Sequence, residues 1–110
     1  MSECIHGVGL CTGSCEEVAV TTKVLDEVLH ERRRQEALFG EQNHELPVYL
    51  SLLVEEVGEV GRAVNEITHK DSDTGLADAR EELVQVAALA VAIVERIDRI
   101  GKMAPPEAPR

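Results

Sequence analysis

The sequence has very few aromatic residues, with one Tyr, one Phe and no Trp among its 110 residues. Any core must therefore be built from Val, Leu, Ile and Ala side chains. A chain of this length forms one domain at most, and a small domain buries a smaller share of its surface than a large one. We therefore expect it to bury further apolar surface against copies of itself, as a homodimer or a homotetramer.

Basic residues are scarce relative to acidic ones, 11 against 21, so the formal net charge is −10. Nucleic-acid binding needs clustered Lys and Arg that neutralise phosphates, and the only dense basic run is the short one from Arg32 to Arg34. This composition argues against a nucleic-acid partner. It still allows an anionic small substrate whose contact is mediated by a divalent cation.

Long apolar runs are also missing. None reaches the roughly 18–20 residues of a membrane span, and no secretory signal is visible, so we expect a cytoplasmic protein with no membrane partner. The only cysteines are Cys4, Cys11 and Cys15. Their odd number argues against a disulfide framework, and with His6 their spacing matches no common zinc pattern. We expect residues 1–16 to form a flexible Cys-containing arm.

Three segments have helical periodicity, and no segment alternates as a strand does. The pattern predicts helices over about 16–38, 47–69 and 76–100, followed by a disordered Pro-rich tail over 101–110. The second and third segments carry apolar residues at heptad spacing, and the third is apolar nearly all round, which is typical of a helix buried on most sides. We expect an all-α helical bundle over 17–100, completed by homo-oligomerisation.

The apolar stripe of the first predicted helix becomes polar midway. Val24, Leu25, Val28 and Leu29 form its apolar part. On the same face it continues as Arg32, Gln35, Glu36 and Phe39. This change predicts that the second half of the helix lines a solvent-filled pocket rather than a dry core.

Oxygen-bearing side chains occur in pairs on the other two predicted helices. Glu56 and Glu59 lie three residues apart on the second helix, and Glu82 and Gln85 do so on the third. Antiparallel packing of these helices would bring the four side chains together. Such hard oxygen donors select magnesium, or alternatively manganese, over zinc, and protein-bound magnesium commonly binds a substrate phosphate.

The segments LLVEEVGEVGRAVNE and LADAREELVQVAALAVAIVERI resemble the MazG-like all-α nucleoside triphosphate pyrophosphohydrolases. The pattern of that family is EExxE, a variable gap and then ExxD. The segment ERRRQEALFGEQNH is also similar to single-domain MazG-like proteins, so the resemblance spans about residues 24–99. In this chain the pattern is formed by Glu55, Glu56, Glu59, Glu82 and Gln85.

The resemblance implies hydrolysis between the α- and β-phosphates of a nucleoside triphosphate, which releases nucleoside monophosphate and pyrophosphate. It makes Glu56, Glu59 and Glu82 metal ligands, and Glu55 a further ligand or the residue that orients the attacking water. Gln85 stands where the family has Asp, so it offers magnesium an amide oxygen without negative charge. One metal site should therefore bind more weakly.

The polar stretch before the second predicted helix is then expected to contact the nucleotide. Phe39 is suited to stacking on the base, and amide side chains are suited to reading its edge. The expected substrate-binding residues are Arg32, Gln35, Glu36, Phe39, Gln42 and His44. Arg99 and Lys102 are weaker candidates for contact with phosphate.

Two other interpretations remain open from the sequence. One is a helical oligomer that kept the fold, lost catalysis and acts as a nucleotide-binding or interaction protein, which Gln85 and the short chain favour. The other is a related pyrophosphohydrolase that acts on phosphoribosyl-ATP. Nothing decisive in the sequence excludes the latter, although the ERRRQ…FGEQNH segment points elsewhere.

Overall fold

The computed structural model describes residues 14–70 and 73–103. These residues form three helices, α1 (Cys15–Phe39), α2 (Leu46–Lys70) and α3 (Asp73–Met103), and no strand. The expected all-α class is therefore confirmed. Within the described residues, no helix is long and apolar enough to cross a membrane.

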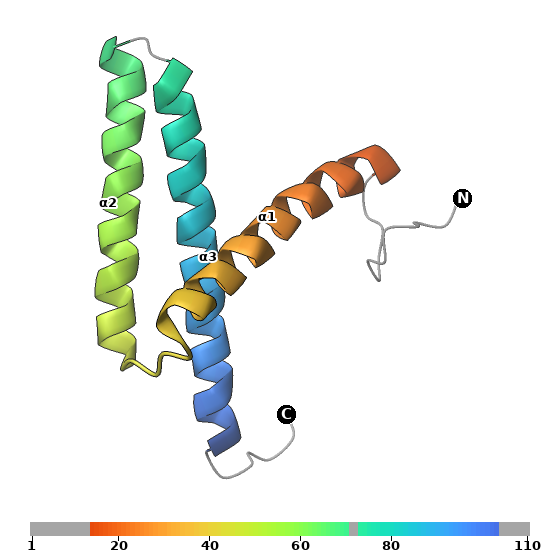
Figure 1. Ribbon diagram of the computed structural model, residues 1–110, viewed down its shortest axis with the longest axis vertical. Coiled ribbons are helices and arrows are strands. Elements are labelled where there is room, and N and C mark those ends of the chain that lie inside the picture. Colours follow the sequence, from red (N-terminus) through yellow and green to blue (C-terminus); the bar gives the residue numbers. More distant parts are fainter. Residues whose placement is uncertain (1–13, 71–72, 104–110) are drawn as a thin grey trace.

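The helices α2 and α3 form a long antiparallel hairpin, and α1 crosses α3 obliquely (Figure 1). The C-terminal part of α1 lies on α3, whereas its N-terminal part points away from the hairpin (Figure 1). A short loop over residues 40–45 connects the end of α1 to the start of α2. The crossing places the second half of α1 beside the seam of the hairpin.

The α1 helix begins at Cys15, whereas the sequence predicted a flexible arm up to residue 16. The Ser14 Oγ accepts a hydrogen bond from the Glu17 N–H at 3.1 Å, and the Glu17 carboxylate accepts one from the Ser14 N–H at 2.9 Å. This reciprocal capping satisfies two backbone donors that a helix start leaves unpaired, so Cys15 and Glu16 belong to the helix. The rest of the predicted arm, residues 1–13, lies outside the described residues.

The ends of the other elements also have local causes. Gly40 ends α1 with a φ of 71°, a value that glycine adopts without strain, and its N–H donates to the Glu36 carbonyl at 2.7 Å. The α3 helix continues to Met103, three residues into the predicted tail, and no proline occurs between its first residue and Pro105 to interrupt it. The remainder of that tail, residues 104–110, lies outside the described residues.

The buried core consists mainly of small side chains. Its buried apolar residues are Val28, Tyr49, Ala63, Ala79, Ala88 and Ala92. Near the turn of the hairpin the two helices approach so closely that a Cβ on Gly75 would lie 2.6 Å from the Ile67 Cγ1. Alanine and glycine at the contact thus allow α2 and α3 to pack at short range.

Many large apolar side chains remain at the surface of the single chain. Leu83 is 52% exposed and Val94 is 57% exposed, although both belong to α3. The expectation that α3 is buried on most sides is therefore not met within one chain, because α1 and α2 cover only part of its circumference. Leu25 on α1 is exposed to a similar extent, at 61%.

Candidate functional site at the hairpin seam

The predicted metal ligands line two adjoining cavities along the hairpin. Glu56 and Gln85 line a cavity of about 220 Å³, which we call the three-helix cavity because α1, α2 and α3 all contribute to it. Glu59 and Glu82 line a second cavity of about 170 Å³, which we call the acidic cavity. The antiparallel packing thus places all four side chains along the seam, the line of contact between α2 and α3. Each predicted pair contributes one residue to each cavity.

The acidic cavity concentrates negative charge between α2 and α3. Its lining residues are Glu59, Arg62, Ala63, Glu66, Asp78, Glu81 and Glu82. Arg62 is the one basic residue in this lining, and its guanidinium lies 3.6 Å from the Glu59 carboxylate. A single arginine faces five carboxylates, so the cavity keeps an excess of negative charge.

Glu82 experiences this charge most strongly. Its pKa is raised above the ordinary value, first because its partial burial disfavours the ionised form, and then because Glu56 and Glu59 place negative charge near it. Glu81 and Asp78, on the same helix, add smaller effects in the same direction. The Glu82 carboxylate therefore interacts across the seam with those of Glu56 and Glu59.

These acids are not gathered into a finished metal site. Within the residues that the structure describes, no group of three or more His, Cys, Asp or Glu side chains is arranged to hold a metal ion. Glu55, expected to bind metal or orient water, is exposed and lines neither cavity. The arrangement is a row of oxygen donors along a seam.

Three of the predicted substrate-binding residues do line the three-helix cavity. They are Gln35 and Phe39 at the end of α1, and Gln42 in the following loop. Phe39 is 65% exposed, so its ring is accessible for stacking. Leu52 and Leu89 add apolar surface from α2 and α3.

Glu31 and Arg34 also line this cavity, although the sequence analysis did not select them. The Glu31 carboxylate accepts two hydrogen bonds from Arg34, both at 2.8 Å, and one from the Gln35 amide at 3.0 Å. The bond from Arg34 is the main reason that the pKa of Glu31 is lowered. Glu31 lies one helical turn before Gln35, so extending the polar stripe backwards by four residues would have found it.

The other three predicted residues lie outside this lining. Arg32 donates to Glu95 on α3 at 2.7 Å, and Glu36 accepts from Arg33 at 3.3 Å. The ring of His44 packs edge-on against Tyr49, with 5.1 Å between ring centroids. Successive helix positions are rotated by about 100°, so α1 presents residues 31 and 35 to the cavity while residues 32 and 36 face elsewhere.

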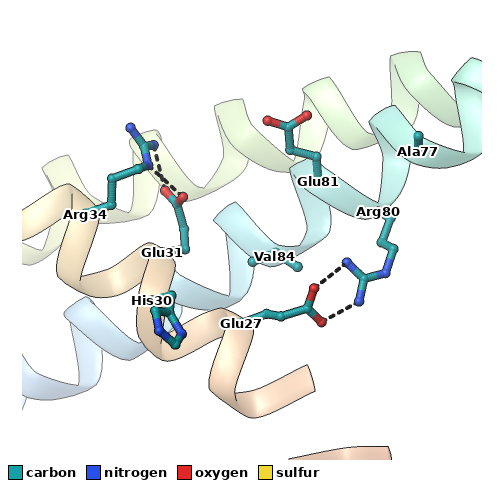
Figure 2. Close-up of a pocket in the computed structure, with 8 residues that line it drawn as sticks. All are labelled: Glu27, His30, Glu31, Arg34, Ala77, Arg80, Glu81 and Val84. Atoms are coloured by element: carbon teal, nitrogen blue, oxygen red, sulfur yellow. Dashed lines mark hydrogen bonds and ion pairs between the residues drawn. The ribbon is translucent and has the colours of Figure 1, made fainter. Parts of the chain in front are cut away.

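A larger cavity of about 510 Å³ lies between α1 and α3 (Figure 2). Figure 2 shows Glu27 and Arg80 reaching toward each other across it, with two hydrogen bonds of 3.0 and 2.5 Å. The bond from Arg80 lowers the pKa of Glu27. Because its arginines are already paired with carboxylates, this cavity has less uncompensated charge than the seam.

Comparison with protein-family models, curated proteins and solved structures found no match. The function is therefore inferred from the residues and the geometry of the seam.

Proposed function

We propose that this protein is a magnesium-dependent nucleoside triphosphate pyrophosphohydrolase of MazG-like type, releasing nucleoside monophosphate and pyrophosphate. The observation that carries the proposal is the placement of Glu82 on α3 against Glu56 and Glu59 on α2, with Gln85 one turn further along. Partly buried carboxylates that repel each other cost stability unless a counter-charge is present. A divalent cation supplies that charge.

The donor set fits magnesium. Glu56, Glu59 and Glu82 would hold the ion through carboxylate oxygens and Gln85 through its amide oxygen, and such hard donors suit magnesium or manganese. Arg62 partly compensates Glu59, so binding competes with one weak ion pair. When bound, magnesium neutralises phosphate charge and lowers the pKa of a coordinated water.

The three-helix cavity is suited to hold the nucleotide beside these acids. Glu56 and Gln85, two of the four proposed ligands, line the same hollow as Gln35, Phe39 and Gln42, which are the proposed base contacts. Phe39 stacks on the base, and the two amides read its edge. Glu55 is exposed and lines neither cavity, so it has no assigned role here, and catalysis depends mostly on positioning by the other residues.

The exposed apolar faces support a homo-oligomer. Val24, Leu25 and Leu29, which share one side of α1, are 41%, 61% and 49% exposed. Contiguous apolar surface of this kind is usually covered by a partner in stable small proteins. We take a second copy of the chain to be that partner, in a homodimer or a homotetramer.

The direct test is pyrophosphate release from a panel of nucleoside triphosphates with magnesium. We expect release by the wild-type protein, loss on chelation, and a decrease of at least about 100-fold in kcat/KM for Glu56→Gln, since a ligand charge is removed. Asp98→Asn is the matched control, because Asp98 is exposed on α3 and lines none of the cavities described. Equal rates in wild type and Glu56→Gln would refute the proposal.

The alternative is a catalytically silent MazG-like oligomer that binds nucleotide or a protein partner. Gln85 favours it, because the neutral amide removes one charge from the donor set. Titration calorimetry combined with the pyrophosphate assay separates the two functions. A silent protein gives no pyrophosphate even where magnesium and nucleotide bind.

A further inference from the structure

The loop over residues 40–45 has little support from its own backbone. Among these described residues, backbone hydrogen bonds hold only its two ends, where Gly40 donates to Glu36 and where Val48 and Tyr49 donate to the Glu45 carbonyl. Glu41, Gln42 and Asn43 are exposed. The middle of the loop therefore depends on side chains from other elements.

Those side chains come from α2 and from the C-terminal part of α3. The Gln42 carbonyl accepts two hydrogen bonds, from the Tyr49 hydroxyl at 2.6 Å and from Arg99 at 3.1 Å. Arg99 also donates to the Asn43 side-chain oxygen at 3.1 Å, and Arg96 donates to the His44 carbonyl at 3.1 Å. We call Tyr49, Arg96 and Arg99 the loop clamp.

The loop clamp is anchored more firmly than the loop it holds. Tyr49 is 3% exposed, and the Arg99 side chain is 27% exposed and lies 3.5 Å from the Glu41 carboxylate. Arg96 and Arg99 are three residues apart on one face of α3. Rigid helical positions thus fix three consecutive loop residues, 42 to 44.

Gln42 connects the clamp to the candidate site. Its main-chain carbonyl is held by Tyr49 and Arg99, while the residue itself lines the three-helix cavity next to Phe39 and Gln35. Arg96 and Arg99 lie far from the acids of the seam, since Arg96 follows Glu82 by 14 residues, or about 21 Å along a helix. Arg96 and Arg99 line a separate hollow that contains none of the predicted metal ligands.

We propose that Arg99, together with Arg96 and Tyr49, is a positioning residue that fixes the nucleobase end of the three-helix cavity through Gln42, rather than a phosphate ligand. This inference rests on the proposed function and adds a division of labour to it. The acids of the seam act on the phosphates, and the clamp sets affinity for the base. Loss of the loop clamp should therefore weaken binding of the base and leave the rate of the chemical step unchanged.

The experiment compares the full-length wild type with Arg99→Ala in magnesium-dependent pyrophosphate release. We expect KM for the best nucleotide to rise about tenfold with kcat within about twofold, because ground-state positioning of the base is lost. Inorganic tripolyphosphate has no base, so its inhibition constant should stay within about twofold. Arg33→Ala is the matched control, since Arg33 is exposed and pairs only within its own helix, with Glu36.

Each outcome separates the possibilities. An unchanged KM in Arg99→Ala, or a tripolyphosphate inhibition constant that rises in parallel with KM, would overturn the clamp while leaving the hydrolase in place. No pyrophosphate from the wild type would overturn the proposed function and this inference with it. If Arg99→Ala does not fold, Arg99→Lys is measured instead, because lysine keeps the charge but cannot donate in the two directions that the guanidinium does. We expect an intermediate rise in KM. A KM equal to that of the wild type would count against the clamp.

Discussion

The two ends of the candidate site differ in how far their charged side chains are paired with groups of opposite charge. Beside the connecting loop, cationic groups are matched with acceptors: Arg32 with Glu95, Arg96 with the His44 carbonyl, and Arg99 with Glu41 and the loop. Along the middle of the hairpin, Glu82 faces further carboxylates and a single arginine lines the acidic cavity. One end is compensated and the other is not.

The difference indicates what each end is for. Paired charges hold the chain's own elements together and need nothing further. Like charges that face each other oppose folding, and such costs are retained mainly at functional sites. Substitutions at the acidic end and at the compensated end should therefore change stability in opposite directions.

The largest expected effect is stabilisation of the wild-type chain by magnesium. A ligand at 100 times its Kd that binds only the folded state adds about 2.7 kcal/mol to the free energy of unfolding. Thermal denaturation with and without magnesium measures this, with sodium chloride at matched ionic strength as the control. Glu82→Gln should gain much less, and an equal gain in both proteins would place the ion elsewhere.

A gain of function is expected when the neutral amide of Gln85 is replaced by a carboxylate. Gln85→Asp should raise the affinity for magnesium about tenfold, or about 1.4 kcal/mol, since a charged ligand replaces a neutral one. Titration calorimetry measures the affinity. Asn65→Asp, an amide-to-acid change at an exposed position of α2, is the control and should leave it unchanged.

Much of the fold could be predicted because its signals are local. Apolar periodicity gave the three helices, and Gly40 and Pro47 marked the connection between the first two. The pattern of Ser14 followed by Glu17 was an equally local signal for the start of α1, as a capping box. The three-residue spacing of the oxygen-bearing side chains also predicted that Glu56 on α2 and Glu82 on α3 would face each other across the seam.

What could not be predicted depends on contacts between distant residues. The pairing of Arg99 with a loop more than 50 residues earlier leaves no trace in the spacing of either segment. The rotation of α1 about its axis is set by such pairs as Arg32 with Glu95 and Arg80 with Glu27. For this reason Glu31 and Arg34 line the cavity beside the expected Gln35 and Phe39, whereas Arg32 and Glu36 do not.

A smaller effect concerns the pH dependence of stability without magnesium. The pKa of Glu82 is raised in the folded state, so the folded chain holds this proton more tightly than the unfolded chain. The resulting stability is present in acid and is lost as the pH rises through the folded pKa. Glu82→Gln removes that loss, so it should match the wild type at about pH 4 and exceed it at about pH 7 by less than about 1 kcal/mol.

Urea denaturation over this pH range measures the difference between the two proteins. Asp98→Asn is again the control, because Asp98 is exposed on α3 and lines neither the acidic cavity nor the three-helix cavity. A Glu82→Gln variant that is less stable than wild type at neutral pH would show that the negative charge of the seam is compensated even without a cation.

The smallest effect is expected at the compensated end, from the ion pair between Arg32 and Glu95. The Arg32 side chain is 13% exposed and the Glu95 side chain 46% exposed, so water screens the pair in part. A double-mutant cycle with Arg32→Met and Glu95→Gln should give a coupling of about 0.5–1 kcal/mol in favour of the folded state. The sign is the decisive result: removing a carboxylate here lowers stability, whereas removing Glu82 at neutral pH raises it. If Glu95→Gln and Glu82→Gln both lower the free energy of unfolding at neutral pH, the carboxylates at both ends are compensated. The acidic residues of the seam would then give no support for a cation site.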